Sequence, residues 1–222
     1  MITHSLKTKA SIYALIFLLF SCGGNQKDQK EDQQEAKKEE SSGGSMSDAV
    51  KSIKGLSTIA NHSEDIEKMQ KTLSSLKPVN NEQLKAALPA TLIGIKRSEF
   101  SIGDNAGLAG LQSGQATYDK DGEHSLKLTL TDGAGETGSG IASLQYMGLM
   151  TDHEKETNEG FEKNIDLNGQ RVSLEESKNG DRVDSKLTSL YNKRFIVSLE
   201  GDGIPASDLE KAFKELDLGV LK

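Results

Sequence analysis

The sequence has few of the residues on which small disulfide-bonded domains and many binding sites depend. It contains one cysteine, Cys22, three prolines and no tryptophan in 222 residues. A single thiol cannot form an intramolecular disulfide, and no zinc site built on paired cysteines is possible. The fold therefore depends on its apolar core. Because tryptophan is absent, sugar binding by ring stacking is disfavoured as well.

Excess positive charge is also lacking. The formal net charge is -7, and the four arginines, at positions 97, 171, 182 and 194, are scattered singly along the chain. Proteins that bind nucleic acid cluster lysine and arginine against phosphates, so no nucleic-acid partner is expected. The same acidity argues against a polybasic attachment to anionic lipid.

The motifs of common catalytic and metal sites are missing. The sequence has no His-Glu-x-x-His stretch, no Gly-x-Ser-x-Gly elbow and no P-loop lysine after its glycine clusters. His124 and His153 occur in contexts typical of exposed turns and loops. Asp119-x-Asp121-Gly122 is similar to part of a calcium loop but lacks the further ligands, and a hairpin turn explains it better. We expect no catalytic residues, no metal, no cofactor and no enzymatic activity.

One set of acidic residues leaves a catalytic alternative open. Four carboxylates on neighbouring predicted strands are candidates to converge as a glycosidase-like pair, although the same residues also suit a solvated sheet face. They are Glu175, Glu176, Asp181 and Asp184.

An apolar run over residues 10–20 is too short to cross a bilayer, which takes roughly 20 apolar residues as a helix. Lys7 and Lys9 precede the run, and Ser21 and Cys22 follow it. A positive stretch, an apolar stretch of about 7–15 residues and a small residue before the cut are typical of secretory signal peptides. The sequence predicts an export signal over residues 1–21, cleaved between Ser21 and Cys22.

The segment Leu19-Phe20-Ser21-Cys22 resembles the lipobox of bacterial lipoproteins. The resemblance implies diacylation of the Cys22 thiol, cleavage after Ser21 and acylation of the new amino terminus. Several acyl chains anchor a protein stably, because each buried CH₂ contributes about 0.8 kcal/mol. Gly23 stands where aspartate retains some lipoproteins in the inner membrane, which favours the outer membrane of a Gram-negative bacterium. The alternative is an ordinary secreted protein.

Two segments precede the main domain. Residues 22–45 are predicted to be the lipidated cysteine followed by a disordered tether, because residues 23–45 carry charges of both signs and no aromatic or branched aliphatic side chain. Residues 46–77 are predicted to form an amphipathic helical segment with a break near residue 61. We call its apolar residues the stripe: Met46, Val50, Ile53, Leu56, Ile59, Ile66, Met69, Leu73 and Leu76. The stripe suits packing on its own domain or pairing with a partner helix; its polar face of mixed charge disfavours a membrane surface.

Residues 78–222 are predicted to form one α+β domain. A capping box at Asn80 opens a helix that ends by Leu88, and a second at Ser207 opens the last helix. Alternating apolar residues and two-residue turns predict a curved antiparallel sheet of about 6–7 strands, with helices packed on one face. The predicted strands are residues 92–102, 115–118, 125–131, 161–167, 171–177, 183–191 and 195–200, and a third helix is predicted at 141–150.

This succession of elements loosely resembles the sheet-and-helix domains of the PsbP and Mog1-like group, which also occur in bacterial lipoproteins. The resemblance concerns the fold and implies no functional residues.

Two functions remain as hypotheses. The first is a membrane-anchored module of the cell envelope that binds or scaffolds another envelope protein through the stripe or an exposed sheet face. The second is a carrier or sensor of a small apolar ligand, with the glycine-rich residues 103–114 as a flexible mouth to a pocket. The alternative for these glycines is a plain mobile loop or strand connection.

Overall fold

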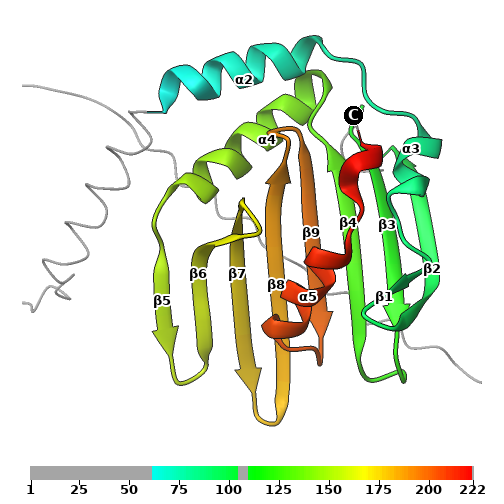
Figure 1. Ribbon diagram of the computed structural model, residues 1–222. Coiled ribbons are helices and arrows are strands. Elements are labelled where there is room, and N and C mark those ends of the chain that lie inside the picture. The colour runs from blue at the N-terminus through cyan, green and yellow to red at the C-terminus, as the bar shows by residue number, and fades with distance from the viewer. Residues whose placement is uncertain (1–61, 105–109, 222) are drawn as a thin grey trace, which may run out of the picture. The chain divides into compact units, whose positions relative to one another are not determined.

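A nine-stranded antiparallel sheet forms the body of the structure, a computed structural model that describes residues 62–104 and 110–221 (Figure 1). The strand order is β1-β2-β3-β4-β9-β8-β7-β6-β5, so the last strand of the chain lies in the middle of the sheet. The strands are β1 (Thr91–Leu92), β2 (Ile95–Asp104), β3 (Gln112–Asp119), β4 (Ser125–Asp132), β5 (Glu154–Thr157), β6 (Gly160–Leu167), β7 (Gln170–Asn179), β8 (Arg182–Tyr191) and β9 (Phe195–Asp202).

Within residues 62–104 and 110–221, four α-helices and one short 3₁₀ turn accompany the sheet. The helices are α2 (Ser63–Ser75), α3 (Asn81–Ala86), α4 (Gly135–Met150) and α5 (Ala206–Glu215), and the turn is η1 (Leu218–Val220). The predicted capping box at Asn80 is confirmed, because its side chain accepts the Gln83 amide and the Gln83 side chain accepts the Asn80 amide. The predicted capping box at Ser207 is wrong: α5 begins at Ala206, with Pro205 at the N-cap position and no side-chain cap.

The main core lies on the face of the sheet that α3 and α5 cover. Alternate residues of the central strands point to this face, as the period of two requires. On β4 these residues are Leu126, Leu128 and Leu130, all fully buried. Leu209 and Phe213 of α5 belong to the same apolar cluster. We call this side of the sheet the core face.

A second, smaller cluster lies at one end of the opposite face. Leu190 of β8 and Ile196 of β9 are directly paired and point away from the main core. They contact a cluster formed by α4 and α2, to which Tyr146 and Leu149 of α4 and Leu73 of α2 belong. The expectation that all helices lie on one face is therefore wrong, because α4 covers the end of the other face.

The sheet also has more strands than the 6–7 predicted. The additional β1 and β5 are short edge strands, and all four residues of β5 are exposed. Because β5 has the sequence Glu-Lys-Glu-Thr, it has no apolar alternation by which a strand is normally predicted.

A buried ion pair fixes the start of α4. Asp132, fully buried at the end of β4, accepts two bonds from the Arg194 guanidinium, at 2.7 and 2.8 Å. Its two oxygens also accept the backbone amides of Val79 at 2.8 Å and Ala134 at 3.0 Å. The neighbouring Gly133 has no room for a side chain, since a Cβ atom there would lie 2.5 Å from the Arg194 carbonyl oxygen. This network joins three distant chain segments.

Candidate functional site

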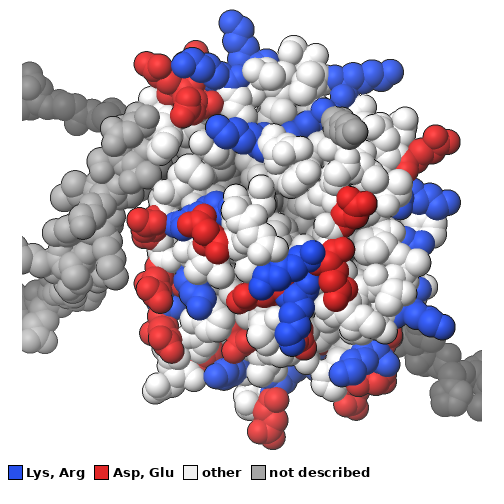
Figure 2. Space-filling model, viewed as in Figure 1, with Lys and Arg blue, Asp and Glu red and all other residues white. Residues whose placement is uncertain are grey.

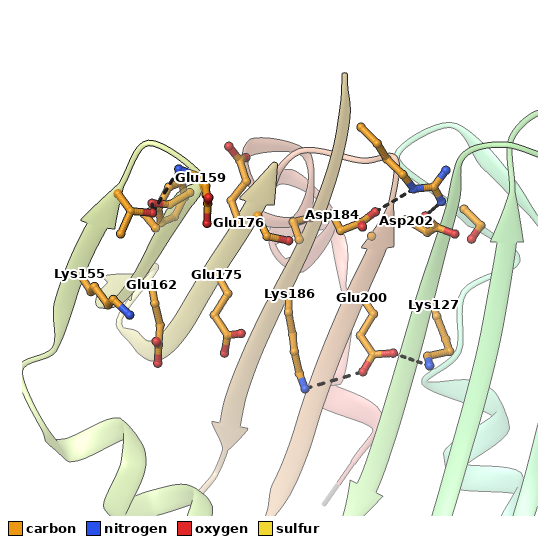
Figure 3. Close-up of a pocket in the computed structure, with 18 of the residues that line it drawn as sticks. Lys127, Lys155, Glu159, Glu162, Glu175, Glu176, Asp184, Lys186, Glu200 and Asp202 are labelled. Atoms are coloured by element: carbon orange, nitrogen blue, oxygen red, sulfur yellow. Dashed lines mark hydrogen bonds and ion pairs between the residues drawn. The ribbon is translucent and has the colours of Figure 1, made fainter. Parts of the chain in front are cut away.

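The face of the sheet opposite the main core carries a row of charged side chains at its open end. Its members are directly paired from strand to strand, so their side chains lie side by side across the sheet (Figure 3). We call this set the charged row; from β4 to β5 it consists of Lys127, Glu200, Lys186, Glu175, Glu162 and Lys155.

Opposite charges are neighbours at the centre of the charged row. One carboxylate oxygen of Glu200 forms an ion pair with the Lys127 ammonium group. The other oxygen lies 3.8 Å from Lys186 Nζ. All three side chains are two-fifths to one-half exposed. Exposed ion pairs contribute about 0–1 kcal/mol to stability, so this arrangement does little to hold the fold together.

Two carboxylates of the charged row face each other without an intervening cation. Glu162 and Glu175 are directly paired on β6 and β7. Glu162 lies 3.4 Å from His153 Nε2, whereas no hydrogen bond or ion pair from any described residue reaches the Glu175 carboxylate. Like charges directly opposite on a sheet destabilise it, so this pair favours a neighbouring positive charge.

A second acidic pair lies at the outer end of the same face, where it is neutralised. Asp184 and Asp202 are directly opposite on β8 and β9. The Arg182 guanidinium contacts both, at 3.3 Å from Asp184 and in a closer ion pair with Asp202. Glu162 and Glu175 differ from this pair, because no described cation forms an ion pair with both of them, although Lys155 and Lys186 are their neighbours in the charged row.

The face becomes less polar towards α4. The row next to the charged row consists of uncharged polar residues, including Thr129, Ser198, Thr188 and Ser173. The following row contains Leu190 and Ile196, which α4 covers. The uncovered part of the face is thus the charged part.

A hollow of about 920 Å³ lies over the charged row and the Asp184–Asp202 pair. Seven acidic and four basic residues line it. The carboxylate of one of the acidic residues, Glu176, is bound to the Ala206 amide, so six carboxylates and four basic side chains remain. The side of the molecule seen in Figure 2 carries basic and acidic side chains interspersed at its centre and around its edge. The hollow is a polar, net acidic surface that is open to solvent.

The four carboxylates proposed from the sequence do not converge. Glu175 points into the hollow, whereas Glu176, the next residue, accepts the Ala206 amide at the start of α5 with its Oε2 at 3.0 Å. Asp184 pairs with Arg182, and Asp181 lies in the exposed turn between β7 and β8. No glycosidase-like pair is formed by these residues.

The acidic turn between β3 and β4 is a hairpin turn, as predicted. Asp119 accepts the Gly122 amide at 2.7 Å, and Asp121 Oδ1 accepts the amides of Glu123 and His124. The hydrogen bond from the His124 ring lowers the pKa of Asp121. Within residues 62–104 and 110–221, no group of three or more histidine or acidic side chains is placed to hold a metal ion.

Several predicted features lie outside the described residues. These are the signal peptide with Ser21 and Cys22, the tether, the first half of the stripe up to Ile59, and the centre of the glycine-rich mouth at 105–109. Of the mouth's flanks, Leu111 is buried in the structure. None of the helices that the structure describes is both long and apolar enough to span a membrane.

Sequence reasoning missed the charged row as a unit. The charged residues were visible at alternate positions of the strands, but only the register brings Lys127, Lys186 and Glu175 into one line. Comparison of the chain with known protein families, curated proteins and solved structures finds no match.

Proposed function

We propose that this chain is a lipid-anchored, non-enzymatic binding module of the bacterial cell envelope, and that the hollow over the charged row is its binding surface. The observation that carries the proposal is that α4 covers the apolar end of this face and leaves its charged end open. Protein surfaces recognise partners through complementary charge, which gives specificity and steers association.

The charge balance of the hollow indicates the chemistry of the partner. With Glu176 set aside, because its carboxylate binds the Ala206 amide, six carboxylates against four basic side chains favour a protein surface on which lysine and arginine predominate. Glu162 and Glu175 are the groups that gain most from such a partner, because Arg182 already neutralises the other acidic pair. A partner cation placed between Glu162 and Glu175 relieves their mutual repulsion.

The anchor follows from the amino-terminal sequence. Acylated Cys22 would hold the chain at the outer membrane, and a flexible tether of this length spans on the order of 25–30 Å. That distance allows the domain to reach a partner beyond the lipid headgroups.

The second hypothesis, a carrier of small apolar ligands, has less support. Such a ligand needs a pocket lined mainly by apolar side chains. The hollow over the charged row is lined by charged and polar residues, with Phe161 the one aromatic side chain. A protein partner suits this surface better.

Crosslinking in intact cells followed by mass spectrometry of proteins and lipids tests the proposal. Four forms are compared: wild type, Cys22→Ala, the face variant Glu162→Lys/Glu175→Lys, and the control Glu64→Lys/Glu67→Lys, which makes the same charge change on the exposed side of α2. We expect one stoichiometric protein partner that is lost in Cys22→Ala, reduced at least tenfold in the face variant and retained in the control.

Three results would contradict the proposal. Equal loss of the crosslinked partner in the face variant and in the control would mean that the net charge of the protein, and not this face, determines binding. Retention in the face variant would place the binding surface elsewhere. Recovery of a small lipid without any protein would favour the carrier.

A further inference from the structure

Helix α4 differs from the other helices because it is apolar on its outward side as well. No residue from Thr137 to Met150 carries a charge. Its inward residues, among them Ala142, Tyr146 and Leu149, pack against α2 and the sheet. A helix that is apolar all round is normally covered on all sides.

The outward side of α4 is exposed within the described residues. Leu144 is 66% exposed, the largest exposed fraction among the large apolar side chains that the structure describes. Gly140 and Gly148 lie four residues before and after it, on the same side of the helix. A Cβ atom at either glycine would meet no described atom within 4 Å. We call this side, with Ile141 and Met147 at its borders, the α4 groove.

The glycines of the α4 groove destabilise the helix, and no contact among the described residues requires them. Each glycine in a helix interior destabilises it by about 1 kcal/mol relative to alanine. Since neither Gly140 nor Gly148 approaches another described atom closely, packing inside the described unit does not explain them. They are explained if another segment lies against the helix at this place, where a side chain would hold it away.

We propose that the α4 groove is occupied by residues 46–60 of the same chain, docked as a helix through the first half of the stripe. These residues carry Val50, Ile53 and Leu56 at helical spacing. The inference does not depend on the binding function proposed above.

Chain connectivity favours this occupant over any other. Only Asn61 separates the segment from His62, the N-cap residue of α2, and α2 itself packs against α4 (Figure 1). Closing so short a connection costs little entropy compared with recruiting a separate molecule. Fifteen helical residues extend about 22 Å, and the sixteen residues of α4 extend about 24 Å. The segment and the groove therefore match in length and in apolar character.

Photocrosslinking of the full chain in intact cells tests this occupant. A benzophenone amino acid replaces Leu144, and the same replacement at Glu156 on the exposed edge strand β5 serves as the control. We expect the Leu144 form to give an intramolecular product at monomer mass, with the linked peptide inside residues 46–60, and the Glu156 form to give none.

A second pair of variants tests whether the stripe makes the contact. In the Leu144 form, Ile53→Asp should lower the yield of the product at least fivefold, because it places a carboxylate in the groove. Thr58→Asp adds the same charge to the opposite side of the segment and should leave the yield within twofold. A crosslink to a second copy, to another protein or to lipid overturns the proposal, as does the absence of any product or equal yields in the two variants.

Discussion

The two faces of the sheet use charge in opposite ways. On the core face, Asp132 is fully buried and its bonds are all satisfied within the fold, by the Arg194 guanidinium and two backbone amides. On the other face, the charges of the hollow are exposed, and Glu175 is left without a partner among the described residues. Charge on the first face holds the fold together, whereas charge on the second remains exposed to solvent.

The largest expected difference in stability between the two faces is that between substitutions of Arg194 and Arg182. Arg194→Ala leaves the buried Asp132 carboxylate without its cation, and breaking one side of a buried pair costs about 3–5 kcal/mol of unfolding free energy. Arg182→Ala removes the half-exposed arginine that contacts Asp184, and should cost under about 1 kcal/mol.

Urea denaturation of the two variants beside wild type measures this difference. Equal losses in Arg194→Ala and Arg182→Ala would show that the buried pair is not a stabilising feature of the core face. If Arg194→Ala does not fold, Arg194→Lys retains the charge and should lose less.

A smaller effect is expected from neighbouring residues of β9 that point to opposite faces. Leu199 is fully buried and Ser198 belongs to the uncharged polar row. Leu199→Ala should lower the unfolding free energy by about 2–5 kcal/mol, because a cavity replaces a packed side chain. Ser198→Ala should change it by less than about 0.5 kcal/mol. Thermal denaturation of both variants checks the alternation, and similar losses would contradict the assignment of the two faces.

Alkaline pH provides a third test, in which comparison with Tyr118→Phe isolates the contribution of one hydroxyl on the core face. Burial raises the pKa of Tyr118 to about 12, and its hydroxyl donates to the Pro89 carbonyl at 2.9 Å. Because the folded pKa lies above the unfolded value near 10, the stabilisation is complete below pH 10 and is lost as pH rises towards 12. The unfolding free energy of wild type should therefore fall by about 2 kcal/mol more than that of Tyr118→Phe over this interval. Parallel pH profiles would contradict the burial of this hydroxyl.

The smallest effect is expected within the charged row. Lys186→Glu places four carboxylates in succession across the sheet, because the new one lies between Glu200 and Glu175, and Glu162 follows Glu175. Like-charge contacts at an exposed site cost up to about 1 kcal/mol, and salt screens them. The loss of unfolding free energy in Lys186→Glu should be smaller at high salt than at low salt, whereas the stability of Lys186→Gln should depend little on salt. A loss of several kcal/mol that salt does not change would show that the row is part of the core.

The strands that the sequence predicted well are those with a clear period of two and short turns. β6 to β9 follow the predicted ranges closely, and Asn168 and Gly169, both with positive φ, form the two-residue turn between β6 and β7. These features are local, so a single sequence contains all the information needed.

The missed features depend on contacts between distant residues. The start of α4 at Gly135 is glycine-rich, and it is fixed by Asp132 and Arg194, which lie 62 positions apart. The start of α5 uses the Glu176 carboxylate of β7 in place of the expected Ser207 cap. The charged row likewise depends on register. The charged residues are visible in the sequence, but which of them lie next to one another across the sheet could not be predicted from it.

The central position of β9 has a consequence for the order in which the protein folds. β9 completes the sheet by pairing with β4 on one side and β8 on the other, so the pairing that joins the two halves uses the last strand to be synthesised. Contacts of high sequence separation form late and slow folding. In a chain that leaves the ribosome or an export channel amino terminus first, the edges of β4 and β8 therefore stay open until residue 202 has emerged. A truncation before β9 should leave both halves prone to aggregation.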